Sequence, residues 1–311
     1  MRILFAGSPA IAVPSLARAA NRGELAGVLT NPDSVRGSKK QPEATDVGAA
    51  AVHFLPESAL LKPEKLDAAA RNAVEQMQPD LLVSFAYGKI FGPKFLSLFP
   101  LGGINIHPSL LPLYRGPTPI PAALLNRDSK TGITIQALGA EMDAGDIFLQ
   151  ERFPLSGKET TATLSEFVAQ RAAELLPVVL DGINAGTMHG QKQNSADATY
   201  CHLISKEDGL IKWSKSAVEI EACVRAYTPW PLVYTWHQHH CLYILESGVY
   251  SGENSEMPGT VLGTDKDAGI LVQTGQGILG ITRLHYQYKK PLFWKDFQNG
   301  SRGFFGSQLG A

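Results

Sequence analysis

The sequence has few cysteines, and they form none of the patterns found in disulfide-rich or zinc-binding proteins. Cys201, Cys223 and Cys241 are widely spaced, odd in number and contain no C-x-x-C pair. This spacing excludes a disulfide framework and a thiolate zinc site, and it favours a reducing compartment. We therefore expect a cytoplasmic protein.

Long apolar runs are also missing. No stretch approaches the roughly 18 consecutive apolar residues that a membrane span requires. The chain opens with a short apolar run that ends at Gly7, and not with a charged segment followed by a long apolar one. The sequence therefore predicts neither a signal peptide nor a membrane partner.

The chain has no excess of charge of either sign. Its 311 residues contain 28 lysines and arginines against 29 aspartates and glutamates, which gives a formal net charge of -1. A nucleic acid would therefore have to be held by a local cluster of cations, because no global positive field attracts it. The length favours two domains, and a hydrophobic fraction of 44% is enough to build their cores.

Two kinds of patterning divide the chain. Through the first two hundred residues, short apolar runs alternate with helical patterns, which is typical of an α/β fold with a Rossmann-like, mostly parallel sheet. A polar, glycine-containing stretch over 184–198 then indicates a linker, and short β-rich runs after it predict a small β-barrel. We expect a catalytic domain over 1–188, a linker over 189–203 and a C-terminal barrel over 204–311.

The same patterning predicts individual elements. Strands are expected over 2–6, 25–30, 81–86, 103–107, 132–138, 147–153, 233–236, 241–245, 259–262, 269–273 and 277–284. Helices are expected over 10–21, 63–77 and 118–126, and after each of two capping boxes. These boxes are Thr163-x-x-Glu166 and Ser216-x-x-Glu219, in which the first side chain and the fourth satisfy each other's backbone N–H groups.

The glycines argue against a bound dinucleotide or nucleoside triphosphate. Gly7 ends the first predicted strand, but the second and third glycines of G-x-G-x-x-G are missing, and no G-x-x-x-x-G-K-[ST] occurs. We interpret Gly7 as part of a tight turn. An anion contact at the start of the following helix stays open as an alternative.

The segment 102–121, GGINIHPSLLPLYRGPTPIP, carries the strongest signal for chemistry. Asn105 and His107 lie two residues apart on a predicted strand, so their side chains project from the same face. Pro108 and Pro112 turn the chain out of the strand and make a stiff apolar loop beside them. An amide and an imidazole next to a rigid apolar wall suit a planar heteroaromatic ligand.

A second polar segment, GAEMDAGDI over 139–147, follows the next predicted strand. Asp143 precedes Gly145 in this turn, from which its side chain could reach His107. Aspartate is also common in turns for purely local reasons, and this explains Asp143 and Asp146 equally well. From the pattern alone, a structural role and a catalytic role both stay open.

The two segments together resemble the signature of the folate-dependent formyltransferases. The matching residues are Asn105-x-His107-Pro108-Ser109-Leu110-Leu111-Pro112-x-Tyr114-Arg115-Gly116-Pro117, followed by Met142-Asp143-Ala144-Gly145-Asp146-Ile147. The resemblance covers nearly the whole chain and is strongest to the members that formylate methionine on initiator tRNA. Three stretches carry this narrower resemblance: 2–9, the basic loop within 30–40, and 204–231.

The resemblance implies an enzyme that transfers a formyl group from 10-formyltetrahydrofolate, as co-substrate, to an α-amino group. Asn105, His107 and Asp143 would be catalytic. Such a transfer passes through a tetrahedral oxyanion, to which Asn105 and a protonated His107 would donate hydrogen bonds. Asp143 would raise the pKa of His107 and keep it competent as an acid.

Binding residues are implied in the same way. The pterin would lie in a cleft formed by Phe85, Ala86, Tyr87 and Gly88 on one side and by Ser109, Leu110, Leu111 and Pro112 on the other, although ordinary sheet packing is the alternative for Phe85 and Tyr87. The C-terminal domain would be an oligonucleotide-binding-like barrel that binds tRNA. Arg36, Lys39, Lys40 and Lys206 would contact the tRNA, whose phosphates attract such cations.

Two other functions stay open. A formyltransferase that acts on an amino sugar nucleotide would share the catalytic residues and an appended barrel, but the cations within 36–40 and the form of 225–231 argue against it. A catalytically silent RNA-binding protein would not need Asn105, His107 and Asp143 together. We expect no metal, because consecutive residues of the segment 237–241, HQHHC, point to opposite faces of a strand and its histidines therefore do not form one ligand set. We also expect a monomer.

Overall fold

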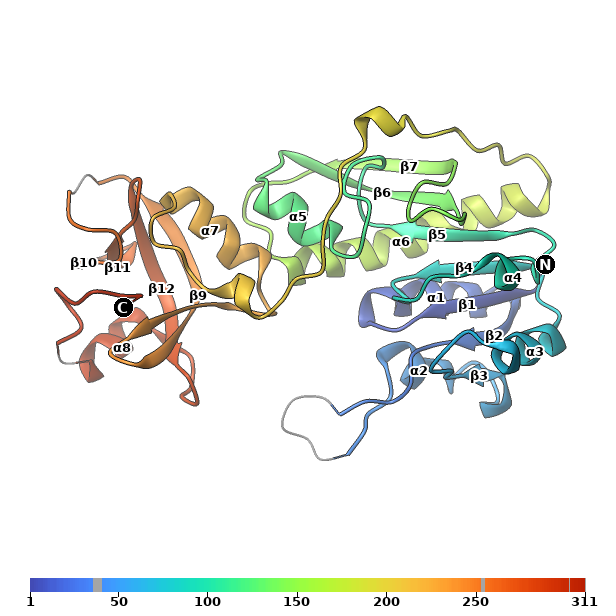
Figure 1. Ribbon diagram of the computed structural model, residues 1–311, viewed down its shortest axis with the longest axis horizontal. Coiled ribbons are helices and arrows are strands. Elements are labelled where there is room, and N and C mark those ends of the chain that lie inside the picture. The colour runs from blue at the N-terminus through green and yellow to red at the C-terminus, as the bar shows by residue number, and fades with distance from the viewer. Residues whose placement is uncertain (36–40, 253–254, 302, 311) are drawn as a thin grey trace. The chain divides into compact units, whose positions relative to one another are not determined.

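A computed structural model describes residues 1–35, 41–252, 255–301 and 303–310. The chain forms two compact units (Figure 1). The first contains Met1–Pro119, Lys130–Pro154 and Leu164–His202, and the second contains Ile120–Ser129, Leu155–Thr163 and the chain from Leu203 onward. Residues 189–202, which the polar sequence marks as a linker, thus lie in the first unit. The predicted boundaries at 188 and 203 stay predictions.

A seven-stranded sheet forms the centre of the first unit, with the order β3-β2-β1-β4-β5-β6-β7. The strands are β1 Ile3–Gly7, β2 Leu25–Leu29, β3 Leu60–Leu61, β4 Leu81–Phe85, β5 Gly103–His107, β6 Lys130–Ala137 and β7 Ile147–Pro154. The first five in this order are parallel, and β6 and β7 join in antiparallel fashion. The Rossmann-like, mostly parallel sheet predicted from the sequence is confirmed.

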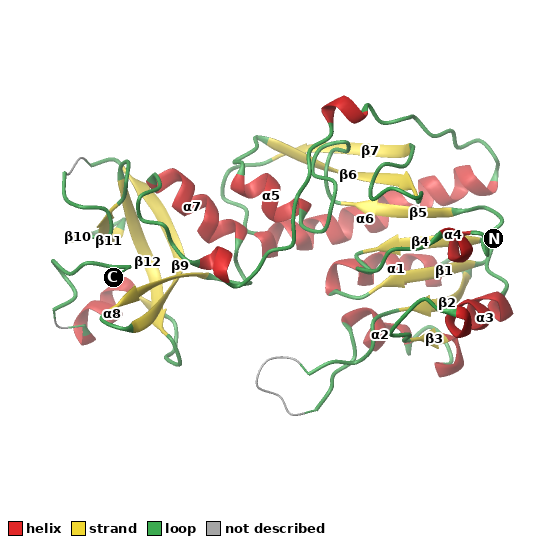
Figure 2. Cartoon of the chain, in the orientation of Figure 1, coloured by secondary structure: helices red, strands yellow, loops and turns green. Residues whose placement is uncertain are grey.

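The apolar composition of the central strands explains why they lie in the middle of the sheet. Every residue of β1 and β4 is buried, as expected for apolar runs that are covered on both faces of a parallel sheet. Helices of the first unit flank this sheet in Figures 1 and 2. They are α1 Val13–Asn21, α2 Asp46–Ala51, α3 Ala68–Met77, α4 Pro93–Leu96 and α6 Thr161–Asn184, and 3-10 turns lie at Ala10–Ala12, Glu57–Ala59 and Ser195–Asp197. α5 Pro119–Leu125 and a 3-10 turn at Glu207–Gly209 lie in the second unit, except for Pro119.

Two predicted helix starts are corrected by their caps. α3 begins at Ala68, five residues later than predicted, because the side chain of Asp67 accepts the N–H of Ala70. The capping box predicted at Thr163 and Glu166 is wrong. Thr160 accepts the N–H of Thr163 at 3.2 Å, and the hydroxyl of Thr163 accepts the N–H of Thr160 at 3.0 Å, so α6 starts one turn earlier.

The second unit contains a separate sheet in which every pairing is antiparallel. The strand order of this sheet is β10-β11-β12-β9-β8, and β13 pairs with β12. The elements are α7 Ala217–Ala226, β8 Val233–His237, β9 His240–Tyr250, β10 Val261–Asp265, β11 Gly269–Gln273, β12 Ile278–Tyr286, β13 Leu292–Phe293 and α8 Trp294–Gly300. The predicted capping box of Ser216 and Glu219 is present at the start of α7 and is confirmed.

A helix that crosses a membrane has to be both long and apolar. Of the helices within the described residues, none combines the length and the apolar character needed to cross a membrane.

Candidate active site

The candidate site is assembled at the carboxyl end of β5, next to the antiparallel strand β6. Asn105 lies opposite Gln136 in this strand pair, and His107 lies opposite Thr134. Residues directly opposite in an antiparallel pair have neighbouring side chains. The alternation of the two strands therefore places an amide, an imidazole and a second amide on adjoining positions, and the side chain of His107 is only 5% exposed.

The three predicted catalytic side chains meet at this point. Asn105 Nδ2 donates a hydrogen bond to Asp143 Oδ1 at 3.2 Å, and His107 Nδ1 lies 3.6 Å from Asp143 Oδ2. The backbone N–H of Gly116 donates to Asp143 Oδ2 at 2.9 Å, and Gln136 Nε2 donates to Asp143 Oδ1 at 3.0 Å. The carboxylate of Asp143 is thus held by three N–H donors and faces the imidazole.

The tautomer of His107 follows from its other neighbour. His107 Nε2 lies 2.8 Å from the carbonyl oxygen of Tyr114, which can only accept, so Nε2 carries the hydrogen. Burial lowers the pKa of His107, and this effect outweighs the rise caused by Asp143 and by the carbonyl. The predicted effect of Asp143 is present, since its charge raises the pKa of His107, but desolvation disfavours the imidazolium and lowers that pKa more strongly.

The turn that carries Asp143 is shaped by its backbone. Asp143 has a φ of 52°, in the left-handed region, and Gly145 lies so close to β6 that a Cβ there would come 1.9 Å from the carbonyl oxygen of Ala137. A side chain at 145 would therefore force the turn away from the strand. Asp143 does more than form this turn, because the turn directs its carboxylate to Asn105 and His107.

The proline-rich loop after β5 is fixed by hydrogen bonds. Ser109 is fully buried, and its hydroxyl donates to the carbonyl of Leu113 at 2.6 Å. Thr134 donates to the carbonyl of Ser109 at 2.7 Å and accepts the N–H of Leu111 at 3.2 Å. Leu111 is buried as well, and the Leu111–Pro112 peptide bond is cis. Leu110 and Pro112 are partly exposed.

In the segment 85–88, which is also predicted to contact the pterin, two side chains are packed in the core. Phe85 and Tyr87 are 1% and 2% exposed, and the ring of Tyr87 stacks on Phe91 at 5.4 Å. Sheet packing thus accounts for both aromatic rings. Ala86 and Gly88 have positive φ angles of 52° and 82°. Both residues are exposed and have a small side chain or none, so their backbone groups are accessible to a ligand.

Three of the predicted tRNA-binding residues, Arg36, Lys39 and Lys40, lie outside the described residues. On either side of this segment, Ser34 and Glu43 form an isolated antiparallel bridge, in which the two N–H to O distances are 3.1 and 3.0 Å. Lys206 is exposed and precedes a short 3-10 turn in the second unit.

Two of the three histidines of the segment 237–241 form hydrogen bonds within the second unit. His237 Nδ1 is hydrogen-bonded to the hydroxyl of Tyr286 at 2.6 Å, and His240 Nδ1 lies 2.9 Å from the carbonyl oxygen of Gln238. Within the described ranges, no group of three or more histidine, cysteine, aspartate or glutamate side chains is arranged to hold a metal ion.

Sequence reasoning missed two residues that complete the site. Gln136 could have been found from its register, since it lies opposite Asn105 on the neighbouring strand. Gln193 gave no signal, because it belongs to the polar stretch that predicts a linker. Its Nε2 lies 2.8 Å from the carbonyl oxygens of both Asp143 and Gly145.

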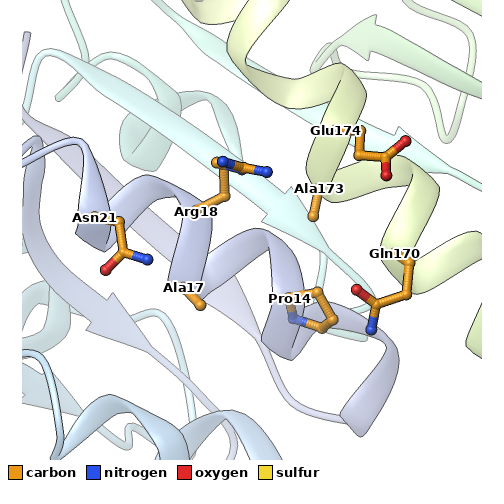
Figure 3. A pocket seen from close by; sticks show the side chains of 7 residues that line it. All are labelled: Pro14, Ala17, Arg18, Asn21, Gln170, Ala173 and Glu174. Atoms are coloured by element: carbon orange, nitrogen blue, oxygen red, sulfur yellow. The ribbon is translucent and has the colours of Figure 1, made fainter.

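A surface hollow elsewhere in the first unit is separate from this site. It lies between α1 and α6 (Figure 3) and is lined by Pro14, Ala17, Arg18, Asn21, Gln170, Ala173 and Glu174. None of the residues that surround Asp143 contributes to it.

An amide, an imidazole and a carboxylate meet at the carboxyl end of a strand, where doubly wound sheets bind ligands, and they can supply the hydrogen-bond donor and the proton acceptor that acyl-group transfer requires. The family model described as formyl transferase matches residues 1–180, and the model described as formyl transferase, C-terminal domain, matches residues 203–302. The chain is 48% identical over 315 residues to methionyl-tRNA formyltransferase from Treponema denticola, with 98% of each chain covered. The chain belongs to the formyl transferase family, as the resemblance of its motifs predicted.

Two solved structures share the fold. HypX from Aquifex aeolicus, in complex with tetrahydrofolic acid, is 17% identical with a TM-score of 0.65, and the match covers 99% of this chain and 48% of that one. This chain therefore spans about half the length of HypX. An N-formyltransferase from Helicobacter canadensis, in complex with folinic acid and dTDP-3-aminofucose, is 19% identical with a TM-score of 0.65, over 90% and 98% of the two chains. At these identities the likeness concerns the fold alone.

Proposed function

We propose that this enzyme transfers the formyl group of 10-formyltetrahydrofolate to the α-amino group of methionine on initiator tRNA, to give N-formylmethionyl-tRNA for translation initiation. The observation that carries the proposal is the convergence of Asn105, His107 and Asp143 on one point of a formyl transferase chain. The identity of 48% to a methionyl-tRNA formyltransferase over the full length supports this choice of acceptor.

The lowered pKa of His107 suits the first step of the reaction, in which an imidazole without a proton on Nδ1 acts as a base. The amine nitrogen attacks the formyl carbon, and its proton must be removed as the tetrahedral intermediate forms. His107 Nδ1 has a lone pair, because Nε2 donates to the carbonyl of Tyr114. When Nδ1 takes up the proton, the imidazolium gains the carboxylate of Asp143 at 3.6 Å as a partner.

The same groups complete the transfer. One N–H of Asn105 Nδ2 is directed to Asp143, and the amide group has a second N–H that can donate to the oxyanion. The proton on His107 then passes to the folate nitrogen as its bond to the formyl carbon breaks. The formyl group ends on the amine, the amine proton ends on the folate, and Asp143 remains a carboxylate throughout.

The substrate contacts in this proposal follow the predicted residues. The backbone of 85–88 and the loop from Ser109 to Pro112 contact the pterin, and Arg36, Lys39, Lys40 and Lys206 contact tRNA phosphates. Residues 1–188 carry out catalysis, and the chain from 204 onward binds tRNA. We place the protein in the cytoplasm as a monomer, and its three cysteines are free thiols, as a reducing compartment requires.

The test mixes purified protein, 10-formyltetrahydrofolate and methionyl-tRNA, and measures N-formylmethionine by mass spectrometry. We expect Asn105→Ala and Asp143→Asn to lose about a hundredfold or more in kcat, the usual cost of removing a donor to an oxyanion or its partner. Full activity of Asp143→Asn would refute the assigned roles.

Comparable formylation of a dTDP-amino sugar would favour a sugar nucleotide as substrate. Tight tRNA binding without any formylation, unchanged in Asn105→Ala, would instead indicate a silent RNA-binding protein.

A further inference from the structure

Arg115 is a buried cation whose guanidinium is hydrogen-bonded to neutral side chains. It is 2% exposed, and its guanidinium donates to Gln193 Oε1 from Nη2 at 2.8 Å and from Nε at 3.2 Å. Nη1 lies 3.4 Å from the hydroxyl of Tyr200. In the part of the chain that the structure describes, no carboxylate forms an ion pair with Arg115. A charge removed from water in this way needs compensation by polar groups.

The direction of the Gln193 amide follows from this contact. Because Oε1 accepts from Arg115, Nε2 faces the Asp143 turn, where it lies 2.8 Å from the carbonyl oxygens of Asp143 and Gly145. Nε2 also lies 3.0 Å from Gln136 Oε1. Gln193 thus joins the buried guanidinium to the turn and to the second amide.

Gln136 continues the chain of hydrogen bonds in the same direction. Its Oε1 accepts from Gln193, so its Nε2 is the atom that donates to Asp143 Oδ1 at 3.0 Å. Gln136 is 1% exposed, and water does not compete for these contacts. A buried cation at one end and a carboxylate at the other are thereby connected through two oriented amides.

We propose that Arg115, Gln193 and Gln136 form a positioning relay that holds the carboxylate and the backbone turn of Asp143 in the geometry needed for formyl transfer. The relay gives Arg115 a counter-charge at its far end. It also supports the left-handed conformation of Asp143, because Gln193 binds the carbonyl of that residue. The proposal rests on the proposed function, in which Asp143 acts on His107.

The relay assigns a role to a segment that both sequence and family comparison leave aside. Residues 181–202 lie outside the two family ranges, and the polar sequence around Gln193 predicts a linker. Other contacts tie the segment to the loop after β5: Arg115 donates its N–H to the carbonyl of Thr199 at 2.8 Å, and Tyr114 donates its N–H to Thr199 Oγ1 at 2.9 Å.

The decisive variant is Gln193→Glu, which keeps the shape of the side chain. Its carboxylate still accepts from Arg115, but it can no longer donate, so its second oxygen faces the carbonyls of Asp143 and Gly145. We expect kcat to fall about tenfold to a hundredfold, as for other residues that orient a catalytic ligand. The KM values for methionyl-tRNA and for 10-formyltetrahydrofolate should stay within about threefold, since the relay faces Asp143 and not a substrate.

Gln191→Glu is the matched control. Gln191 lies in the same segment, its side chain is exposed, and its backbone N–H and carbonyl pair with Ile147, so the same change of charge should leave kcat unchanged. Gln193→Leu provides a second variant that removes the amide without adding a charge. Circular dichroism and thermal denaturation establish that each variant is folded before its kinetics are compared.

A double-mutant cycle separates a relay from two independent contacts. Gln136→Leu and Gln193→Leu interrupt the same path, so the double variant should lose little more activity than the more impaired single one. Multiplicative losses, a change in KM alone, or full activity of Gln193→Glu would overturn the relay. If the wild-type protein formylates no methionyl-tRNA, the proposed function fails first. If it does and Gln193→Glu is fully active, only the relay fails.

Discussion

At the scale of single residues, His107 shows how burial and a neighbouring charge oppose each other. Its pKa is lowered below 6.5, and the imidazole of the unfolded chain has its ordinary value. Below pH 6.5 the unfolded state therefore binds more protons than the folded state, and the free energy of unfolding falls as the pH falls toward the lowered pKa. The slope approaches about 1.4 kcal/mol per pH unit for one such group.

This slope can be measured by urea denaturation between pH 7 and pH 5. The difference between the wild-type protein and His107→Gln isolates the contribution of one histidine, since burial also lowers the pKa of His237. We expect the variant to lose less stability on acidification than the wild-type protein. Equal slopes would show that His107 titrates alike in the folded and unfolded states.

Gly145 gives the second prediction at this scale. A Cβ at position 145 would come 1.9 Å from the carbonyl oxygen of Ala137, whereas a Cβ at Gly139 would meet nothing within 4 Å. Gly145→Ala must displace the turn that carries Asp143, and we expect a loss of kcat of about tenfold or more, as for other small displacements of catalytic groups. Gly139→Ala, at the other end of the same turn, should retain its activity.

The residues of the site were predictable to different degrees. Asn105 and His107 share one strand and a motif, and Asp143 belongs to a second motif, so the sequence identifies all three. The side chains of Phe85 and Tyr87 illustrate the opposite case, because an aromatic residue next to a cleft and one in the core have the same local pattern. Gln193 could not be predicted from the sequence, because its role depends on a long-range contact with Arg115 and no local periodicity indicates that contact.

At the scale of elements, two strands of the two sheets were predicted to the residue, whereas several short helices and two-residue strands were missed. The strands at 103–107 and 269–273 match β5 and β11 to the residue. α2 and α4 have six and four residues, and β3 and β13 have two each, too few to display a periodic pattern. Elements this short are stabilised mostly by tertiary packing, and the local sequence contains little information about that packing.

The first turn of α6 provides a test at the same scale. The hydroxyls of Thr160 and Thr163 cap each other's backbone N–H groups, whereas the side chain of Glu166 has no part in this cap. Thr160→Ala should lower the free energy of unfolding by about 1 kcal/mol, the usual value of an N-cap. Glu166→Ala serves as the control in the same denaturation experiment and should change it by less than about 0.5 kcal/mol. If Glu166→Ala lowered the free energy of unfolding more than Thr160→Ala, the result would support the capping box of Thr163 and Glu166 that the sequence predicts.

At the scale of the whole molecule, the balance of charge limits how tRNA can be bound. With 28 basic and 29 acidic side chains, the protein as a whole does not attract a polyanion, so affinity must come from a few local cations. Each phosphate contact releases condensed counterions, and the logarithm of the binding constant falls with the logarithm of the salt concentration by about 0.9 per contact on a duplex. A small number of contacts therefore predicts a shallow salt dependence.

Lys206 is the described residue at which this idea can be tested. We expect kcat/KM for methionyl-tRNA to decrease with added KCl, and Lys206→Ala to reduce the slope of the double-logarithmic plot by about 1. Lys65→Ala removes an exposed cation of the first unit that has no assigned role, and it should leave the slope unchanged. The KM for 10-formyltetrahydrofolate should not respond to Lys206→Ala, since the folate has few charges. A salt slope that stays the same in Lys206→Ala would remove this lysine from the tRNA contact and leave the cations within 36–40 as the remaining predicted ones.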